Sequence, residues 1–359
     1  MALALSAAAW GGCSTPPPTS APSDPGTLSR DSGVVRAPFS GERVVRDSEA
    51  LVALGSRSPG SSSAKRAEQW LGERLRQIGA TVEVWPLADS RAESEGSDAP
   101  APTRAIVGVL AGEGQDPVLL LARYDTLPGE RDGAGPGDFS AAAGAAMVLE
   151  LGRVLAESTR PFPVWLVLIE GDGGAGRPGA AGASALGDRA ARFPGSQALA
   201  TELVQRDLIG RIRLAIYLGS LPGPRLVVAR DLRSHRLYRE SFWHSAEKSG
   251  DVQLFPPSAE FSSPQQGHLA LLAQGLRPTV ALVGAASEAG PAALQPLPAS
   301  AGDLESLGRV TLDTLDQITG RLRRLEAFAD SPADATEEKN SRAAAERPDS
   351  GSEGVSRAP

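Results

Sequence analysis

The stretch Leu119–Glu150, LLLARYDTLPGERDGAGPGDFSAAAGAAMVLE, decides the fold class. It begins inside an apolar run, Val118–Ala122, whose length suits a buried strand. A loop rich in Gly and Pro follows, and Ser140 can then cap a helix that continues to about Leu155. A strand, a loop and a helix in this order are typical of an α/β protein.

Helix and strand signals alternate on both sides of this stretch. Apolar residues recur at helical spacing over Ala64–Ile78, and the β-branched run Thr81–Trp85 comes directly after Gly79-Ala80. We expect further strands at Ala105–Leu110, Val164–Ile169, Ile212–Leu218, Arg225–Ala229 and Thr279–Val283, and further helices at Ser196–Gln205, Ser234–Ser249 and Asp303–Leu325. The pattern predicts a mostly parallel, mixed central sheet between two helical layers, with any ligand site at the carboxyl ends of the strands.

The two ends of the chain differ in composition from the part between them. Residues 1–12 are short, apolar and rich in small residues, and Cys13 follows them, so they resemble a bacterial lipoprotein signal whose Cys receives the lipid. The alternative is an uncleaved leader. Residues 13–40 read as a Pro/Ser-rich tether, 41–329 as the folded domain and 330–359 as a disordered tail. A lipid on Cys13 predicts an extracytoplasmic, cell-envelope location on the periplasmic face or outer membrane.

Composition excludes several classes of function. The net charge is −7 and the isoelectric point is about 5.2, with no basic cluster, which argues against nucleic-acid binding. A single cysteine excludes an intramolecular disulfide and a thiolate metal cluster. There are three histidines, His235, His244 and His268, so a multi-histidine site would need nearly all of them.

Several short blocks resemble the zinc aminopeptidase and glutaminyl-peptide cyclotransferase family, in particular its bacterial glutaminyl-cyclase-like branch. Gly55–Ser61 and the helix after it match the opening of those proteins. Tyr124-Asp125 matches the family's Tyr-Asp, and Gly144–Arg153 matches the helix that follows. The resemblance covers about Val44–Leu325 and implies the zinc-exopeptidase fold, a three-layer αβα sandwich.

The same resemblance implies that most metal-ligand positions have lost their ligands. Arg123 stands where the family has His, Ser140 where it has a ligand Asp, and Gly173 where it has a ligand Glu. A guanidinium has no free lone pair and a neutral hydroxyl is a poor zinc ligand. His268, in Gln266-Gly267-His268, matches a metal-ligand histidine of the family and is the only one of these metal ligands that is retained. Since catalytic zinc usually needs three protein ligands, no cofactor is expected.

Other positions of the implied pocket have changed as well. Asp172 stands at the general base, one methylene shorter than the family's Glu, and Glu170 replaces an Asp. Ile216 replaces an active-site Asp, whereas Asp125 is retained.

These substitutions favour a non-catalytic binding domain over an enzyme. In this hypothesis Arg123 and His268 receive the carboxylate of an unidentified peptide or protein ligand. One alternative is an active zinc aminopeptidase or glutaminyl-peptide cyclotransferase with a metal site rebuilt from Asp138, Asp172 and His268. Another is a structural envelope lipoprotein with a filled pocket.

Overall fold

The computed structural model describes residues 37–87, 103–126, 136–172, 193–223, 225–285 and 299–329, with the backbone alone for 136–138. All of these residues belong to one compact unit, Arg36–Pro359. The predicted signal peptide, Cys13, Gly173 and the tail lie outside the described residues. Phe39, just before α1, is buried against Gly308.

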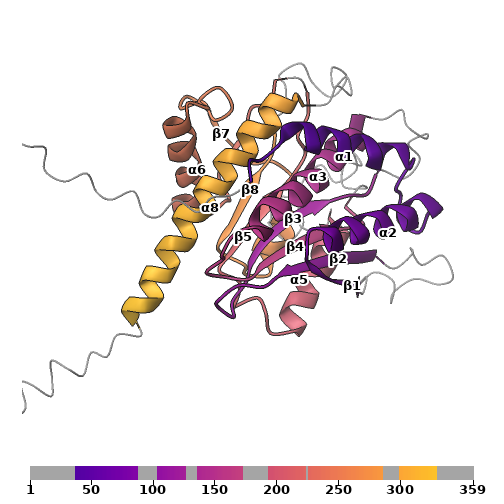
Figure 1. Cartoon of the computed structure of the whole chain (residues 1–359), viewed down its shortest axis with the longest axis horizontal. Coiled ribbons are helices and arrows are strands. Elements are labelled where there is room, and N and C mark those ends of the chain that lie inside the picture. The colour runs from indigo at the N-terminus through magenta and orange to yellow at the C-terminus, as the bar shows by residue number, and fades with distance from the viewer. Residues whose placement is uncertain are drawn as a thin grey trace, which may run out of the picture. The chain divides into compact units, whose positions relative to one another are not determined.

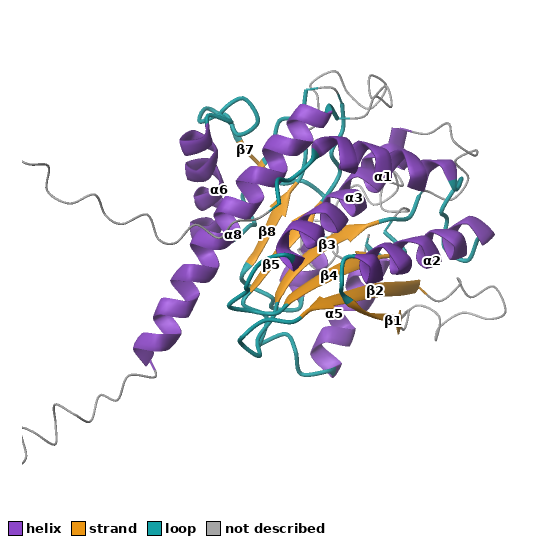
Figure 2. Cartoon of the chain, in the orientation of Figure 1, coloured by secondary structure: helices purple, strands orange, loops and turns teal. Residues whose placement is uncertain are grey.

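A six-stranded mixed sheet forms the middle layer (Figures 1 and 2). Its order is β1 (Thr81–Leu87), β2 (Thr103–Leu110), β4 (Val164–Ile169), β3 (Val118–Arg123), β5 (Leu214–Leu218) and β8 (Thr279–Leu282). The pairs β4–β3, β3–β5 and β5–β8 are parallel, whereas β1–β2 and β2–β4 are antiparallel. The predicted α/β class, with a mixed and largely parallel sheet between helices, is confirmed.

Alternate residues of the strands face two separate apolar layers. Leu120 of β3 packs into the larger layer, and its neighbours Leu119 and Leu121 pack into the smaller one. The helices of the larger layer are α1 (Gly41–Ala53), α2 (Ser62–Gln77), α3 (Pro136–Ala156), α6 (Arg236–Ser249) and α8 (Ala301–Ala329). Two shorter helices, α5 (Pro194–Gln205) and α7 (His268–Ala273), cover the opposite face.

Helix α3 is the core helix of the larger layer. It begins at Pro136, four residues before the predicted start at Ser140, because proline suits the first position of a helix. Its window Phe139–Ala156 is long and apolar enough to cross a membrane, but 83% of that window is buried inside the domain. At Gly144 an added Cβ would lie 2.9 Å from the Leu218 carbonyl oxygen, so glycine permits α3 to lie close to the sheet.

An irregular segment covers the outer edge of β8. The predicted strand Arg225–Ala229 forms only an isolated bridge, Val228 to Gly284, and the regular pairing starts one residue later in β6 (Arg230–Asp231). The two residues of β6 pair in parallel with β7 (Phe261–Ser262). Because this segment occupies the hydrogen-bonding groups of β8, it protects an edge strand.

Candidate functional site

The carboxyl ends of β3, β4 and β5 bring the expected site residues to one edge of the sheet. In the parallel register Arg123 lies opposite Ile169, so the residues just beyond both strands meet. There the carboxylate of Asp125 accepts a hydrogen bond from the backbone N–H of Gly171 at 3.0 Å. Asp125 and the segment after β4 are therefore joined.

Asp172 is bound to Ser196 through both carboxylate oxygens. Its Oδ1 accepts the backbone N–H of Ser196 at 2.9 Å, and its Oδ2 accepts the Ser196 hydroxyl. Ser196 lies in the first turn of α5, where Phe193 at the N-cap position makes no side-chain hydrogen bond. Asp172, only 2% exposed, therefore supplies the acceptor that this helix lacks.

Gly267, in the loop before α7, packs directly against Asp172 and Ser196. A Cβ at Gly267 would lie 2.1 Å from Ser196 Oγ, 2.5 Å from Asp172 Oδ2 and 2.8 Å from the hydroxyl oxygen of Tyr217. Because real Cβ atoms do not approach other atoms so closely, only glycine fits at this position. Asp172, Ser196, Tyr217 and Gly267 therefore form one compact polar cluster, which we call the Asp172 cluster.

Burial sets the protonation of two carboxyls at this edge. It raises the pKa of Asp172 to about 6, with the Asp125 charge adding and the Ser196 hydrogen bonds and Arg123 opposing. It also raises the pKa of Glu170 to about 7, with Asp125 adding and Arg104 opposing. Glu170 is therefore close to half-protonated near neutral pH, whereas Asp172 is mostly ionised there.

His268 faces a different carboxylate. Its Nε2 lies 3.4 Å from Asp231 Oδ2, and both side chains are fully buried. Asp231 also accepts hydrogen bonds from the Ser234 hydroxyl at 2.7 Å and the Arg233 backbone N–H at 3.2 Å. Burial acts to raise the pKa of Asp231, but His268 and these donors outweigh it and lower the pKa.

Arg123 is the accessible cation of the site. Its side chain is half-buried, and its Nη1 donates to the backbone oxygen of Asp125 at 3.4 Å. No carboxylate within the described ranges forms an ion pair with it. Its positive charge nevertheless opposes the rise in the pKa of Asp172.

The other predicted site residues do not lie together in the described structure. Ser140 is buried near the start of α3, and its hydroxyl has no hydrogen-bond partner among the described residues. Ile216 is buried in the larger apolar layer, on the face of the sheet opposite Tyr217. Alternation along β5 therefore separates Ile216 from Asp172. Gly173 and the side chain of Asp138 lie outside the described residues.

The described residues do not fit a zinc site. No group of three His, Cys, Asp or Glu side chains in the described part of the chain is arranged to hold a metal ion. The two best donors, Asp172 and His268, are directed at Ser196 and Asp231 instead. A zinc site needs several ligands at closely fixed distances.

Two residues of this edge, Ser196 and Asp231, were not predicted as site residues. Asp231 is the first residue of Asp231-Leu232-Arg233-Ser234, just before a helix. The N-cap of that helix is His235, so the pattern of short polar residues at helix starts does not mark Asp231 as a site residue. No local signal joins Ser196 to Asp172, because 24 positions separate them in the chain.

No protein-family model matches the chain, and no curated protein matches its sequence. Solved structures do match its fold. A leucine aminopeptidase precursor from Bacteroides thetaiotaomicron has a TM-score of 0.65 at 17% identity, over 79% of this chain and 99% of its own. Glutaminyl cyclase from Porphyromonas gingivalis has a TM-score of 0.64 at 19% identity, over 78% and 98%. The glutaminyl cyclase of an Acidobacteriales bacterium has a TM-score of 0.64 at 18% identity, over 84% and 100%.

The chain thus has the α/β fold of the zinc exopeptidases. Its similar structures are bacterial glutaminyl cyclases and zinc-dependent exopeptidases or aminopeptidase precursors, which confirms the resemblance inferred from the sequence blocks. At identities below 20% this likeness establishes the fold, and the function has to be argued from the site.

Proposed function

We propose that this chain is a non-catalytic binding domain built on the glutaminyl-cyclase and zinc-exopeptidase fold. Its ligand is a peptide or protein segment that presents a carboxylate at the carboxyl edge of the sheet. The observation that carries the proposal is the double hydrogen bond between Asp172 and Ser196.

The pair matters because of where Asp172 stands. By its resemblance, Asp172 occupies the position of a general base, which has to accept a proton from a reacting group. Here both of its oxygens are already acceptors for Ser196, and the side chain is buried behind Gly267. A buried carboxylate that caps a helix is poorly placed to accept a substrate proton.

The chemistry of the former ligand positions supports the same reading. Arg123 carries a positive charge that repels a metal cation, and Ser140 offers only a neutral hydroxyl. The aliphatic side chain of Ile216 has no donor atom. The surviving His268 is buried beside Asp231.

The side chain of Arg123 supports a role of this domain in ligand binding. A half-buried guanidinium without a carboxylate partner in the described structure is suited to receive one from a ligand, because charge-assisted pairs are the stronger hydrogen bonds. His268 is fully buried, so we assign the carboxylate contact to Arg123 alone. We further place the domain in the cell envelope, held by a lipid on Cys13.

The zinc content of the purified full-length chain tests this proposal. We expect elemental analysis to give no zinc above background, and a zinc titration to show no tight stoichiometric site. His268→Ala and the exposed His244→Ala serve as a matched pair. Tight zinc that is lost in His268→Ala but retained in His244→Ala would overturn the proposal. It would favour the zinc enzyme rebuilt from Asp138, Asp172 and His268, to be assayed with aminopeptidase and glutaminyl-cyclase substrates.

A further inference from the structure

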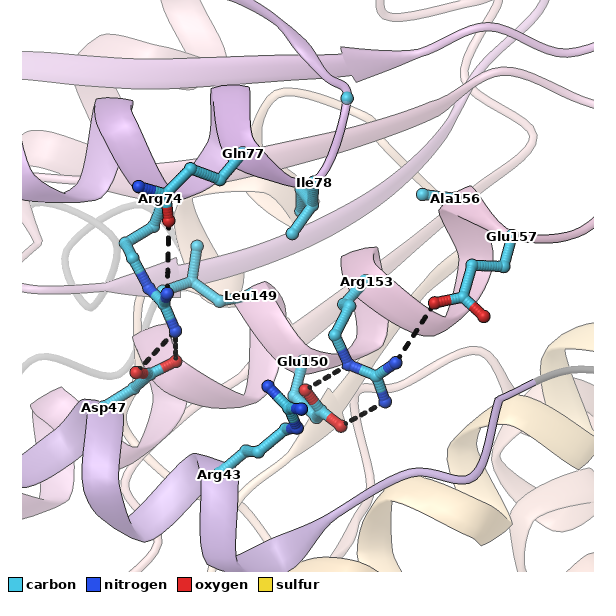
Figure 3. Close-up of a pocket in the computed structure, with 11 residues that line it drawn as sticks. Arg43, Asp47, Arg74, Gln77, Ile78, Leu149, Glu150, Arg153, Ala156 and Glu157 are labelled. Carbon is cyan, nitrogen blue, oxygen red and sulfur yellow. Dashed lines mark hydrogen bonds and ion pairs between the residues drawn. The ribbon is translucent and has the colours of Figure 1, made fainter.

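A separate pocket of about 490 Å³ lies among the helices of the larger layer. Figure 3 shows that α1, the end of α2 and the second half of α3 surround it. Its charged lining residues are Arg43, Asp47, Arg74, Glu150, Arg153 and Glu157. These residues are distinct from those of the Asp172 cluster.

Two ion pairs fix the walls of this pocket. Arg74 Nη2 lies 2.7 Å from each carboxylate oxygen of Asp47. Arg153 binds Glu150 through two hydrogen bonds of 2.9 and 2.7 Å (Figure 3). Glu150 is 3% exposed and also accepts the backbone N–H of Ser40 at 3.0 Å. Arg74 and Asp47, and likewise Arg153 and Glu150, therefore neutralise each other in pairs.

Two further charged residues line the pocket, Arg43 without an ion pair among the described residues and Glu157 with a single one. Arg43 is exposed, and within the described ranges its guanidinium forms no ion pair. Its backbone N–H donates to Ser40 Oγ at 3.3 Å, which places it in the helical turn held at Glu150. The Glu157 side chain is 51% exposed, and its one ion pair is a 3.3 Å contact with Arg153.

Arg43 and Glu157 lie at different levels of the pocket. Glu157 directly follows the last residue of α3 and lies seven residues after Glu150, a rise of about 10 Å. A cation therefore stands near one end and a carboxylate near the other, and the lining also contains the apolar side chains of Ile78, Leu149 and Ala156. A simple anion would be attracted by Arg43 but repelled by Glu157, whereas a ligand with one charge at each end satisfies both.

We infer that this pocket binds a short peptide with free ends, two or three residues long. Its α-carboxylate contacts Arg43, its ammonium group contacts Glu157, and its side chains contact the apolar part of the lining. An extended chain spans roughly 3.5 Å per residue, so two or three residues cover about 10 Å. The ion pairs of Arg74 and Arg153 hold the walls in shape before the peptide arrives, which reduces the ordering cost of binding.

Calorimetric titration of the full chain with trialanine tests this inference. We expect saturable binding of trialanine and much weaker binding of N-acetyl-trialanine and trialanine amide, each of which lacks one charge. Arg43→Gln and Glu157→Gln should each raise Kd about tenfold, as expected for the loss of one charged hydrogen bond. The matched controls are Arg46→Gln and Glu49→Gln, exposed residues of α1 outside the pocket, which should leave Kd unchanged.

The inference is overturned by no saturable binding of trialanine, by equal binding of the blocked peptides, or by equal effects of Arg43→Gln and Arg46→Gln. Arg123→Gln distinguishes binding in this pocket from binding at the carboxyl edge of the sheet. It should not change the Kd for trialanine. A loss of trialanine binding in Arg123→Gln alone would assign the peptide to the edge site and remove it from this pocket.

Discussion

The carboxylate of Asp172 accepts both the backbone N–H and the hydroxyl of Ser196, and thereby joins the end of β4 to the start of α5. The resemblance places a catalytic base at Asp172, but the contact is that of a helix cap. Asp172 therefore has a structural role, and this role explains its burial without a catalytic function.

The Asp172–Ser196 pair should stabilise the fold. We expect Ser196→Ala to lower the free energy of unfolding by about 1 kcal/mol, because it removes one buried hydrogen bond. Asp172→Ala removes the acceptor of two donors, and we expect a loss of about 2–3 kcal/mol. Urea denaturation followed by circular dichroism measures both. Ser241→Ala, at a half-buried residue whose hydroxyl makes a solvent-exposed hydrogen bond to Leu237, is the control, and equal stability of Ser196→Ala and Ser241→Ala would contradict the role of the pair.

Gly267 should tolerate no side chain. A methyl group in Gly267→Ala would meet Ser196 Oγ and Asp172 Oδ2, so we expect a destabilisation of about 1–3 kcal/mol from overpacking. Gly210→Ala is the matched control, because nothing lies within 4 Å of its added Cβ and its φ is not positive. Adding Ser196→Ala to Gly267→Ala should recover part of the loss. A double-mutant cycle without coupling would show that the two residues are not in contact in solution.

Glu170 should make stability fall as the pH rises. Burial raises its pKa from 4.5 to about 7, so the folded state holds the proton more tightly than the unfolded chain. This contribution is complete below the unfolded value and is lost as the pH rises through 7. We expect Glu170→Gln to flatten the change in unfolding free energy between pH 5 and 8, by on the order of 2 kcal/mol. The same slope in Glu170→Gln and in the exposed Glu73→Gln would refute this assignment.

Cys13 should anchor the chain. In a bacterial host that processes lipoproteins, we expect the wild-type protein in the detergent phase after Triton X-114 partitioning, with an N-terminal mass that shows cleavage before Cys13 and acylation. Cys13→Ser should move the protein to the aqueous phase, since the lipid supplies the membrane affinity. Aqueous partitioning of both forms would support the uncleaved leader instead.

The sequence by itself determined the order of most helices and strands, but it did not indicate α1 and α7. The apolar run before Arg123 and the small-residue helix after Ser140 are local patterns, and they set β3 and α3 to within a few residues. The sequence also showed which former ligand positions hold other residue types, because residue identity needs no coordinates. It misjudged Arg225–Ala229, whose partners at the edge of β8 no local pattern specifies.

Only the tertiary structure decided what the polar residues at the sheet edge contact. Asp172 and Ser196 are 24 positions apart, and Asp231 and His268 are still further apart, so neither pair has a local signature. Alternation along β5 sends Ile216 and Tyr217 to opposite faces of the sheet. Contacts of this kind follow from strand order and register, because these bring distant segments together once the sheet has formed.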